Sequence, residues 1–148
     1  MKRKTFTLKE LIRGVKVGLV SGVVLGILSF LGNYYLLVVK YRFEISNALG
    51  RPYNPSMLGL AINALASAVI LTICGILYVL FYTKLPGKKP FWKAFPFGLV
   101  IFTLSRIGDL IVDWLISQGL VIENAFYSAL LLLLLYPYLM SKLYTLEL

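Results

Sequence analysis

Four long runs of mostly apolar residues decide what this chain can fold into. They cover residues 15–39, 57–82, 95–116 and 120–140. The hydrocarbon core of a bilayer is about 30 Å thick, so a helix rising about 1.5 Å per residue needs roughly 20 apolar residues to cross it. Each run reaches that length. We expect an all-α integral membrane protein, built as one four-transmembrane-helix antiparallel bundle over residues 1–148.

The composition favours a membrane fold over a soluble one. Hydrophobic residues make up 59% of the chain and charged residues 14%, whereas soluble domains average about 45–50% and 25%. A net charge of +9 would favour nucleic acid binding in a soluble protein, but here the basic residues lie at the ends of the apolar runs. We therefore expect a lipid bilayer around the chain and no nucleic acid partner.

The placement of the basic residues predicts the orientation, because cytoplasmic segments carry an excess of Lys and Arg. The N-terminal segment and the start of the first span carry six, namely Lys2, Arg3, Lys4, Lys9, Arg13 and Lys16, and the second loop carries four, namely Lys84, Lys88, Lys89 and Lys93. The first loop carries three, Lys40, Arg42 and Arg51, and the third loop carries none. We expect a multi-pass protein of the cell membrane, with both termini cytoplasmic and anionic lipids bound at the cytoplasmic face.

The N-terminal segment has the basic flank of a secretory signal. The apolar run that follows is too long for one and lacks a small-x-small cleavage site, so we expect the first span to be retained. Thr7 and Glu10 have the spacing of a capping box, which predicts a helix that begins at Leu8 and continues into the span.

The residues that the chain lacks exclude several kinds of chemistry. It has no histidine and a single cysteine, Cys74. The commonest metal ligand and general base is therefore missing, and no disulfide can form within the chain. We expect no metal and no cofactor. An enzyme would need Asp109 and Asp113 as an acid and base pair on one helix, with no separate nucleophile in view, so the sequence favours a protein that is not an enzyme.

Small residues recur on one face of the first span. Gly14, Gly18, Gly22 and Gly26 follow one another at intervals of four, and Ser29, Gly32 and Asn33 continue the same face. Such a face lets two helix backbones approach closely inside a membrane. Packing within the chain, most simply against the second span, is the favoured interpretation. A homo-oligomer interface or the wall of a pore is the alternative.

Three ionisable residues lie on one face of the third span. Arg106, Asp109 and Asp113 stand at i, i+3 and i+7, within about 60° of one another. Each such charge inside a bilayer costs about 2.5–3.5 kcal/mol on insertion scales, so this face must turn toward the bundle, a partner or water. Arg106 can pair with Asp109, which leaves Asp113 for another partner or a bound cation. Two interpretations of this face have equal weight. It is a site for an ion, a proton or a substrate, or it is a buried ion-pair network that fixes helix registry.

Polar residues on the other spans fall at the depth of these aspartates. Asn33 lies in the outer half of the first span, Asn63 in the outer third of the second, and Glu123 with Asn124 at the outer start of the fourth. We expect a polar cavity of net negative character that opens outward above an apolar, closed cytoplasmic half. The alternative is that Asn33 and Asn63 only form hydrogen bonds between helices, each worth about 0.6 kcal/mol.

The leucine run at 130–135 is expected to face lipid, and Pro137 to bend or end its helix. Taken together, these features predict a small transport or permeation protein for an ion, a proton or a small polar solute, as a homo-oligomer. The alternative is a non-catalytic membrane subunit or scaffold, whose Arg106–Asp pair and glycine face bind other membrane subunits.

Overall fold

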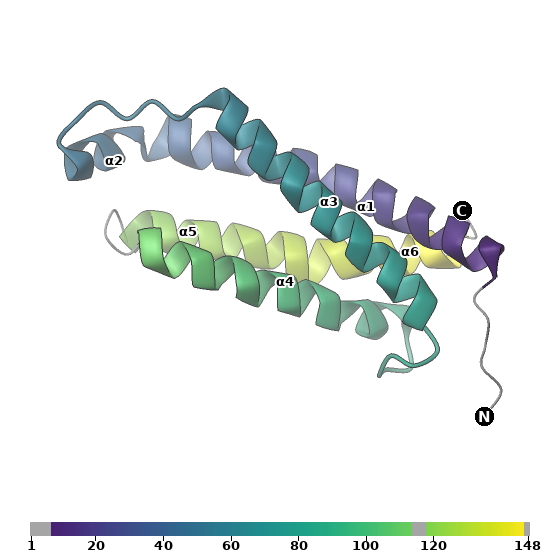
Figure 1. Cartoon of the computed structure of the whole chain (residues 1–148). Helices are drawn as coiled ribbons and strands as arrows, with labels where there is room; N and C mark the ends of the chain where they lie inside the picture. Colours follow the sequence, from purple (N-terminus) through teal and green to yellow (C-terminus); the bar gives the residue numbers. More distant parts are fainter. Residues whose placement is uncertain (1–6, 114–117, 147–148) are drawn as a thin grey trace.

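The computed structural model describes residues 7–113 and 118–146, with side chains at all of these positions except 108–113 and 118–119 (Figure 1). Over these residues the regular structure is entirely helical, which confirms the all-α prediction for them. The helices in chain order are α1 (Leu8–Tyr34), the π-helical segment η1 (Tyr35–Lys40), α2 (Arg42–Leu49), α3 (Met57–Phe81), α4 (Pro90–Asp113), α5 (Gln118–Ala129), the π-helical segment η2 (Leu130–Leu135) and α6 (Tyr136–Thr145).

Three continuous helical rods are long and apolar enough to cross a membrane. They are Leu8–Lys40, Met57–Phe81 and Leu120–Thr145. Many of their large apolar side chains, such as Leu58 and Leu65 of α3, point away from the rest of the protein, as expected of helices that face lipid. These three rods indicate a membrane protein and coincide with three of the four predicted spans. A fourth span in α4 and the orientation of the termini stay predictions.

The first rod begins where the sequence predicts. The Thr7 hydroxyl accepts a hydrogen bond from the Glu10 backbone N–H at 3.3 Å, and the Glu10 carboxylate accepts one from the Thr7 N–H at 3.0 Å. This reciprocal pair is a capping box, and it confirms the predicted helix start at Leu8. The helix therefore extends past the apolar run, and the basic residues from Lys9 to Lys16 belong to the same rod.

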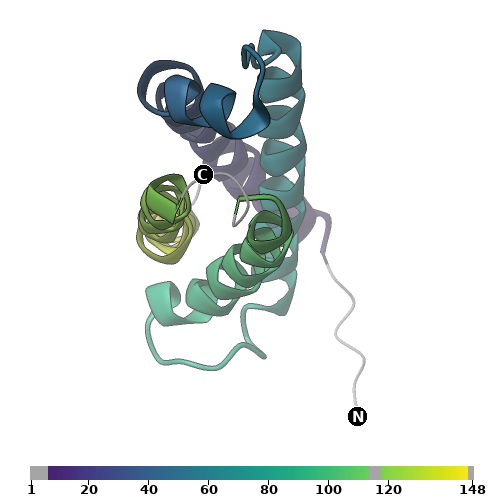
Figure 2. The same cartoon turned by 90° about the vertical axis from the view of Figure 1, so that its left-hand side faces the viewer.

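The rods form two layers. Helices α1 and α3 pack along each other in one layer, and α4 packs against α6 and η2 in the other (Figure 1). The start of α1 and the end of α6 lie at one end of the protein, and α2 lies at the other (Figures 1 and 2). Viewed along the rods in Figure 2, the helices surround a shared interior instead of forming one flat sheet of helices.

The π-helical segment η2 ends at Leu135, two residues before Pro137. A proline has no N–H to donate and its ring collides with the carbonyl four residues earlier, so a wider turn before it relieves the clash. The leucines of η2 do not all face outward, because six consecutive residues of a helix cover its whole circumference. Leu131 is buried and Leu132 packs against the core, while Leu130 and Leu134 are exposed. The prediction of a uniformly lipid-facing leucine run was therefore wrong.

The main core fills the end of the protein where α1 starts and α6 ends. Its buried members come from all four long segments: Val17, Leu25, Leu71, Tyr78, Val79, Ala94, Leu131, Tyr136, Met140 and Leu143. The two buried tyrosines place their hydroxyls on backbone carbonyls, Tyr136 on Leu71 at 2.8 Å and Tyr78 on Pro90 at 3.1 Å. A smaller cluster of Leu36, Tyr41, Ile45 and Leu120 packs α2 onto the opposite end.

Candidate functional site

The glycine face of α1 lies against α3. A Cβ added at Gly22 would stand 2.5 Å from the Ala68 carbonyl oxygen, and one at Gly26 would stand 2.9 Å from the Ala68 Cβ. Gly14 is less tight, with the Ile76 Cα at 3.3 Å from its added Cβ. Backbone of α3 therefore occupies the space that side chains would otherwise fill, and this face offers no room for a second copy of the chain.

At the centre of this interface Gly18 meets a glycine of α3. The Cβ that Gly75 lacks would overlap the Gly18 backbone, and the one that Gly18 lacks would overlap the Thr72 carbonyl. Two facing glycines allow the closest approach of two helices. Gly75 was not singled out from the sequence, because an isolated glycine in an apolar run has no periodic partner on its own helix.

A pocket of 480 Å³ lies between α1, α3, α4, α5 and η2. Three residues predicted from the sequence line it: Asn33 from α1, Asn63 from α3 and Arg106 from α4. The structure adds further polar lining residues from the same helices, namely Ser29, Ser67, Ser105, Asn124, Tyr127 and Ser128. Residues far apart in the sequence therefore place hydroxyl, amide and guanidinium groups around one space.

Arg106 links two helices at the pocket. Its Nη2 donates a hydrogen bond to the Ser128 hydroxyl of α5 at 3.2 Å, and its Cζ lies 5.9 Å from the centroid of the Phe102 ring. Among the lining residues that the structure describes, Arg106 is the only charged one. A guanidinium carries five N–H donors and no acceptor, so it favours acceptor oxygens around it.

Asp109 and Asp113 follow Arg106 on the same helix, and Asp113 is the last residue of α4. Their backbones continue the α-helix from Arg106, which keeps the three positions at the i, i+3 and i+7 spacing. Their side chains lie outside the described residues. The predicted net negative character of the cavity and the predicted pairing of Arg106 with Asp109 stay predictions.

Glu123 lies elsewhere. It forms an ion pair with Lys40 at the end of η1, and each of the two side chains is 41% exposed. Neighbouring residues on an α-helix point about 100° apart. Here Asn124 lines the pocket, whereas Glu123 points to the surface. The sequence placed both at the outer start of the fourth span and did not resolve which of them faces inward.

The two asparagines on α1 and α3 differ in their surroundings. The Asn33 side chain donates to the Ser29 hydroxyl on its own helix at 3.5 Å, a long bond that joins no second helix. Asn63 is exposed on α3, and its backbone carbonyl accepts from the Ser67 hydroxyl at 2.9 Å. Tyr127 of α5, and not Asn33, forms the hydrogen bond to a second helix here. Its hydroxyl donates to the Leu28 carbonyl of α1, and its ring lies against Gly32 of α1.

The pocket reaches the surface between α3 and α4. These two helices diverge from their connecting loop toward the end that holds α2 (Figure 1). Ile70 of α3 and Leu104 of α4 both line the pocket, and they are 51% and 64% exposed. With Asn63 also exposed, the polar interior is accessible from the side of the protein.

Aromatic and basic residues from four segments close the opposite end. The Arg13 Cζ lies 4.1 Å from the Tyr144 ring centroid, Tyr144 stacks on Tyr82 at 4.0 Å, and the Lys93 Nζ lies 4.1 Å from the Tyr82 centroid. Both cations also donate to backbone carbonyls, Arg13 to Tyr144 and Lys93 to Tyr82. Tyr78 packs edge-on against both stacked rings. We call Arg13, Tyr82, Lys93 and Tyr144 the basic–tyrosine stack.

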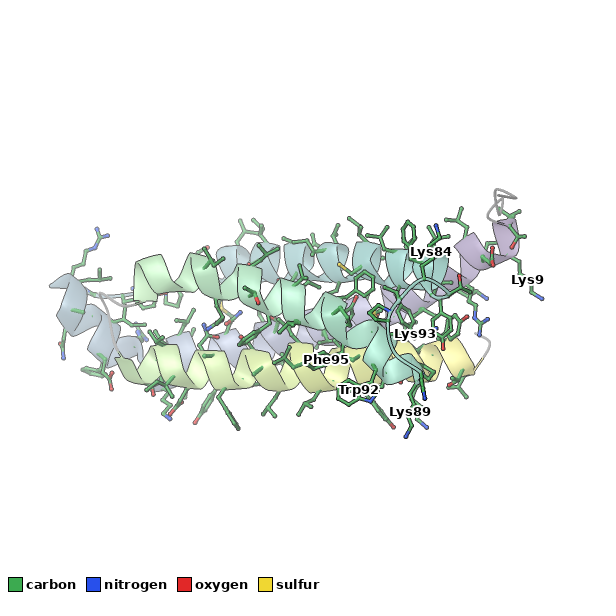
Figure 3. All side chains as sticks on the ribbon, turned by 90° about the horizontal axis from the view of Figure 1, so that it is seen from below. Lys9, Lys84, Lys89, Trp92, Lys93 and Phe95 are labelled. Carbon is green, nitrogen blue, oxygen red and sulfur yellow. The ribbon has the colours of Figure 1, made fainter. Side chains whose placement is uncertain are left out.

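Sequence reasoning missed this stack. Its members lie on α1, on the residue after α3, on α4 and on α6, so no spacing within one helix reveals them. Their only signal is a general one, an excess of basic and aromatic residues near the ends of spans. Figure 3 shows Lys9, Lys84, Lys89, Trp92 and Lys93 at this same end of the helices.

Comparison with known proteins assigns no relationship. No protein-family model matches the chain, and no curated protein or solved structure matches it. Its function must therefore be argued from its own residues.

Proposed function

We propose that this chain is a small multi-pass protein of the cell membrane that transports or conducts an ion, a proton or a small polar solute. The observation that carries the proposal is the pocket. Polar side chains from α1, α3, α4 and α5 converge on one space in a protein whose outside is largely apolar. Its 480 Å³ falls within the roughly 300–1,000 Å³ of small-ligand sites. Polar groups inside a bilayer are costly unless polar partners satisfy them.

In this proposal α4 is the fourth membrane span. A helix of 24 residues rises about 36 Å, which exceeds the roughly 30 Å of hydrocarbon. Helix α4 packs on α6, and its polar residues Ser105 and Arg106 line the pocket. A charged residue in a span is tolerated when it faces a polar interior. Basic residues are in excess at the end of the protein where α1 begins, and this supports a cytoplasmic location of both termini.

Asp109 and Asp113 are the proposed cation-binding groups. They lie beyond Arg106 on α4, toward the end of the helix opposite the basic end. Carboxylates there would supply the negative character that a cation or proton site needs, because the described lining contributes only the positive charge of Arg106.

The barrier of the proposed transport path is the closed end of the protein. The core around Tyr78 and Tyr136 and the basic–tyrosine stack leave the pocket separated from the basic end. Transport would require this end to open, since a polar solute must pass the stacked rings. The pocket is thus the proposed outward-facing state of the cycle.

The proposed partners are lipids and further membrane subunits. Anionic lipids would bind the exposed lysines between α3 and α4, where Trp92 is 56% exposed and suits the interface of a bilayer. A homo-oligomer would have to use a face other than the glycine face of α1, because α3 covers it. The scaffold alternative loses one of its two docking features for the same reason.

Flux into reconstituted vesicles tests the proposal. Ser105 lines the pocket, whereas Thr103 is exposed on the outside of the same helix, and each hydroxyl bonds a carbonyl of its own helix. Ser105→Val and Thr103→Val are therefore a matched pair. Protons, alkali cations and small neutral and charged solutes are offered one at a time to vesicles that contain the wild-type protein or either variant.

The expected result is flux above that of protein-free vesicles for at least one of these species. Ser105→Val should lower that flux, and Thr103→Val should leave it unchanged. Wild-type flux equal to the protein-free background for every species offered would overturn the proposal, and so would equal flux in both variants.

A further inference from the structure

We propose that the polar pocket is entered sideways from the bilayer, between α3 and α4, and that its substrate is a phospholipid whose headgroup occupies the pocket. This rests on the pocket of the proposed transport function and goes beyond the ion, proton or small polar solute named there, because it adds a lipid that enters the pocket from the side. The observation behind it is the lateral opening, where Asn63, Ile70 and Leu104 belong to both the pocket lining and the outer surface.

The surface around this opening is apolar. Ile62 and Val69 flank it on α3, and Val100 and Ile107 on α4, all of them largely exposed. In a bilayer these side chains contact hydrocarbon, so the opening connects a polar interior to lipid tails. An occupant that satisfies both environments carries a polar group inside and an apolar chain outside. This is the arrangement of an amphiphile.

The size of the pocket excludes a helix as the occupant. A helix with its side chains is about 10–12 Å across and rises about 1.5 Å per residue, so even two turns exceed the 480 Å³ of the pocket. That volume suits one lipid headgroup. The apolar chains would leave through the opening and lie over Ile70 and Leu104.

The lining selects the kind of headgroup. The guanidinium of Arg106 binds phosphate oxygens in a planar geometry that a lysine cannot reproduce. Ser128 adds a hydroxyl within hydrogen-bond distance of Arg106. Asn63 and Asn124 add amide groups. A phosphodiester, the group shared by all phospholipids, carries acceptor oxygens that match guanidinium, hydroxyl and amide donors.

Photocrosslinking tests the proposal independently of transport. The probe is a phospholipid with a diazirine next to its phosphate, mixed into phosphatidylglycerol vesicles that hold the full-length chain. A fatty acid with the diazirine next to its carboxylate forms the second arm. Labelled residues are located by mass spectrometry. Ser105→Phe fills the opening from inside, Asn63→Phe fills it from α3, and Thr103→Phe is the matched control on the lipid-facing side of α4.

We expect the phospholipid probe to label pocket residues in the wild type and in Thr103→Phe. In Ser105→Phe and Asn63→Phe, labelling of these residues should fall to the level seen at lipid-exposed residues elsewhere in the protein. Thermal unfolding of each variant identifies any that fail to fold, and the conclusion is drawn from the folded ones and the wild type. Wild-type labelling confined to lipid-facing residues, or labelling of the pocket by the fatty acid alone, overturns the proposal.

A second measurement separates this proposal from the transport function on which it rests. Movement of a fluorescent phospholipid between leaflets is followed in the same vesicles as solute flux. Phospholipid movement that Ser105→Phe abolishes supports lateral entry. Solute flux without lipid labelling or movement overturns lateral entry and leaves the transport function intact. Absence of solute flux overturns the transport function, and absence of both lipid labelling and lipid movement overturns lateral entry.

Discussion

Replacing the glycines of α1 by alanine should destabilise the protein in an order set by the distance to α3. The added Cβ would lie 3.3 Å from its nearest neighbour at Gly14, 2.9 Å at Gly26 and 2.5 Å at Gly22. Overpacking in a tight interface costs about 1–3 kcal/mol. We expect Gly14→Ala near the lower bound and Gly22→Ala near or above the upper one, because its neighbours are a backbone carbonyl and the Thr72 hydroxyl.

The single native thiol makes the assay direct. Cys74 is half-buried on α3, so a thiol-reactive fluorophore reports its exposure during heating in detergent without any introduced cysteine. At roughly 2–4 °C per kcal/mol for a chain of this length, the apparent Tm should fall by about 2–12 °C across the series. Gly59→Ala is the control, since its added Cβ meets nothing closer than 3.6 Å.

An equal loss at all positions, or the largest loss in Gly14→Ala, would refute the proposed packing of α1 on α3. So would dissociation of an oligomer in Gly22→Ala with no change in the Tm of the monomer, because the glycine face would then bind a second chain. Gly59→Ala should not lower the Tm, and a drop there would show that the assay does not report local packing.

Three further changes have defined outcomes. Arg13→Leu removes the cation over the Tyr144 ring and the bond to its carbonyl, so the Tm should fall by an amount equivalent to about 1–2 kcal/mol, while Lys9→Leu should leave it unchanged. In a double-mutant cycle on Lys40→Ala and Glu123→Ala, the two changes in Tm should nearly add, because the pair is exposed; a double variant that loses far less than the sum of the two single variants would contradict the surface placement. Gly98→Ala should lower the Tm more than Gly59→Ala does, since its Cβ would overlap a carbonyl of η2.

Length, apolar pattern and local caps were sufficient to predict the rods. The helix start at Leu8 followed from Thr7 and Glu10, whose hydrogen bonds are local and three residues apart. The bounds of the spans followed from hydrophobic length, which a bilayer fixes physically. The sequence pattern predicts a helix start correctly when the interactions that form it lie within one or two turns of that helix.

Interactions between helices were harder to predict. Glu123 and Asn124 are adjacent in sequence, and only the packing of α5 decides that Asn124 faces the pocket while Glu123 pairs with Lys40. The basic–tyrosine stack joins four segments and has no local signature. The leucines of η2 look alike, yet they point in different directions around the helix, so that Leu131 is buried and Leu130 is exposed. Helix rotation about its own axis is the quantity that the sequence pattern left undetermined.

We infer that polar side chains of four helices enclose a hydrated site inside the membrane, and thiol accessibility measures this hydration. With Cys74→Ala as background, Ser105→Cys and Thr103→Cys are exposed in turn to a charged, water-soluble thiol reagent added outside intact vesicles. We expect rapid modification of Ser105→Cys, because Ser105 lines the pocket, and none of Thr103→Cys, because Thr103 is exposed on the outside of the helix, where lipid would cover it. Equal reactivity of the two variants, or modification of Thr103→Cys alone, would show that the pocket is not hydrated.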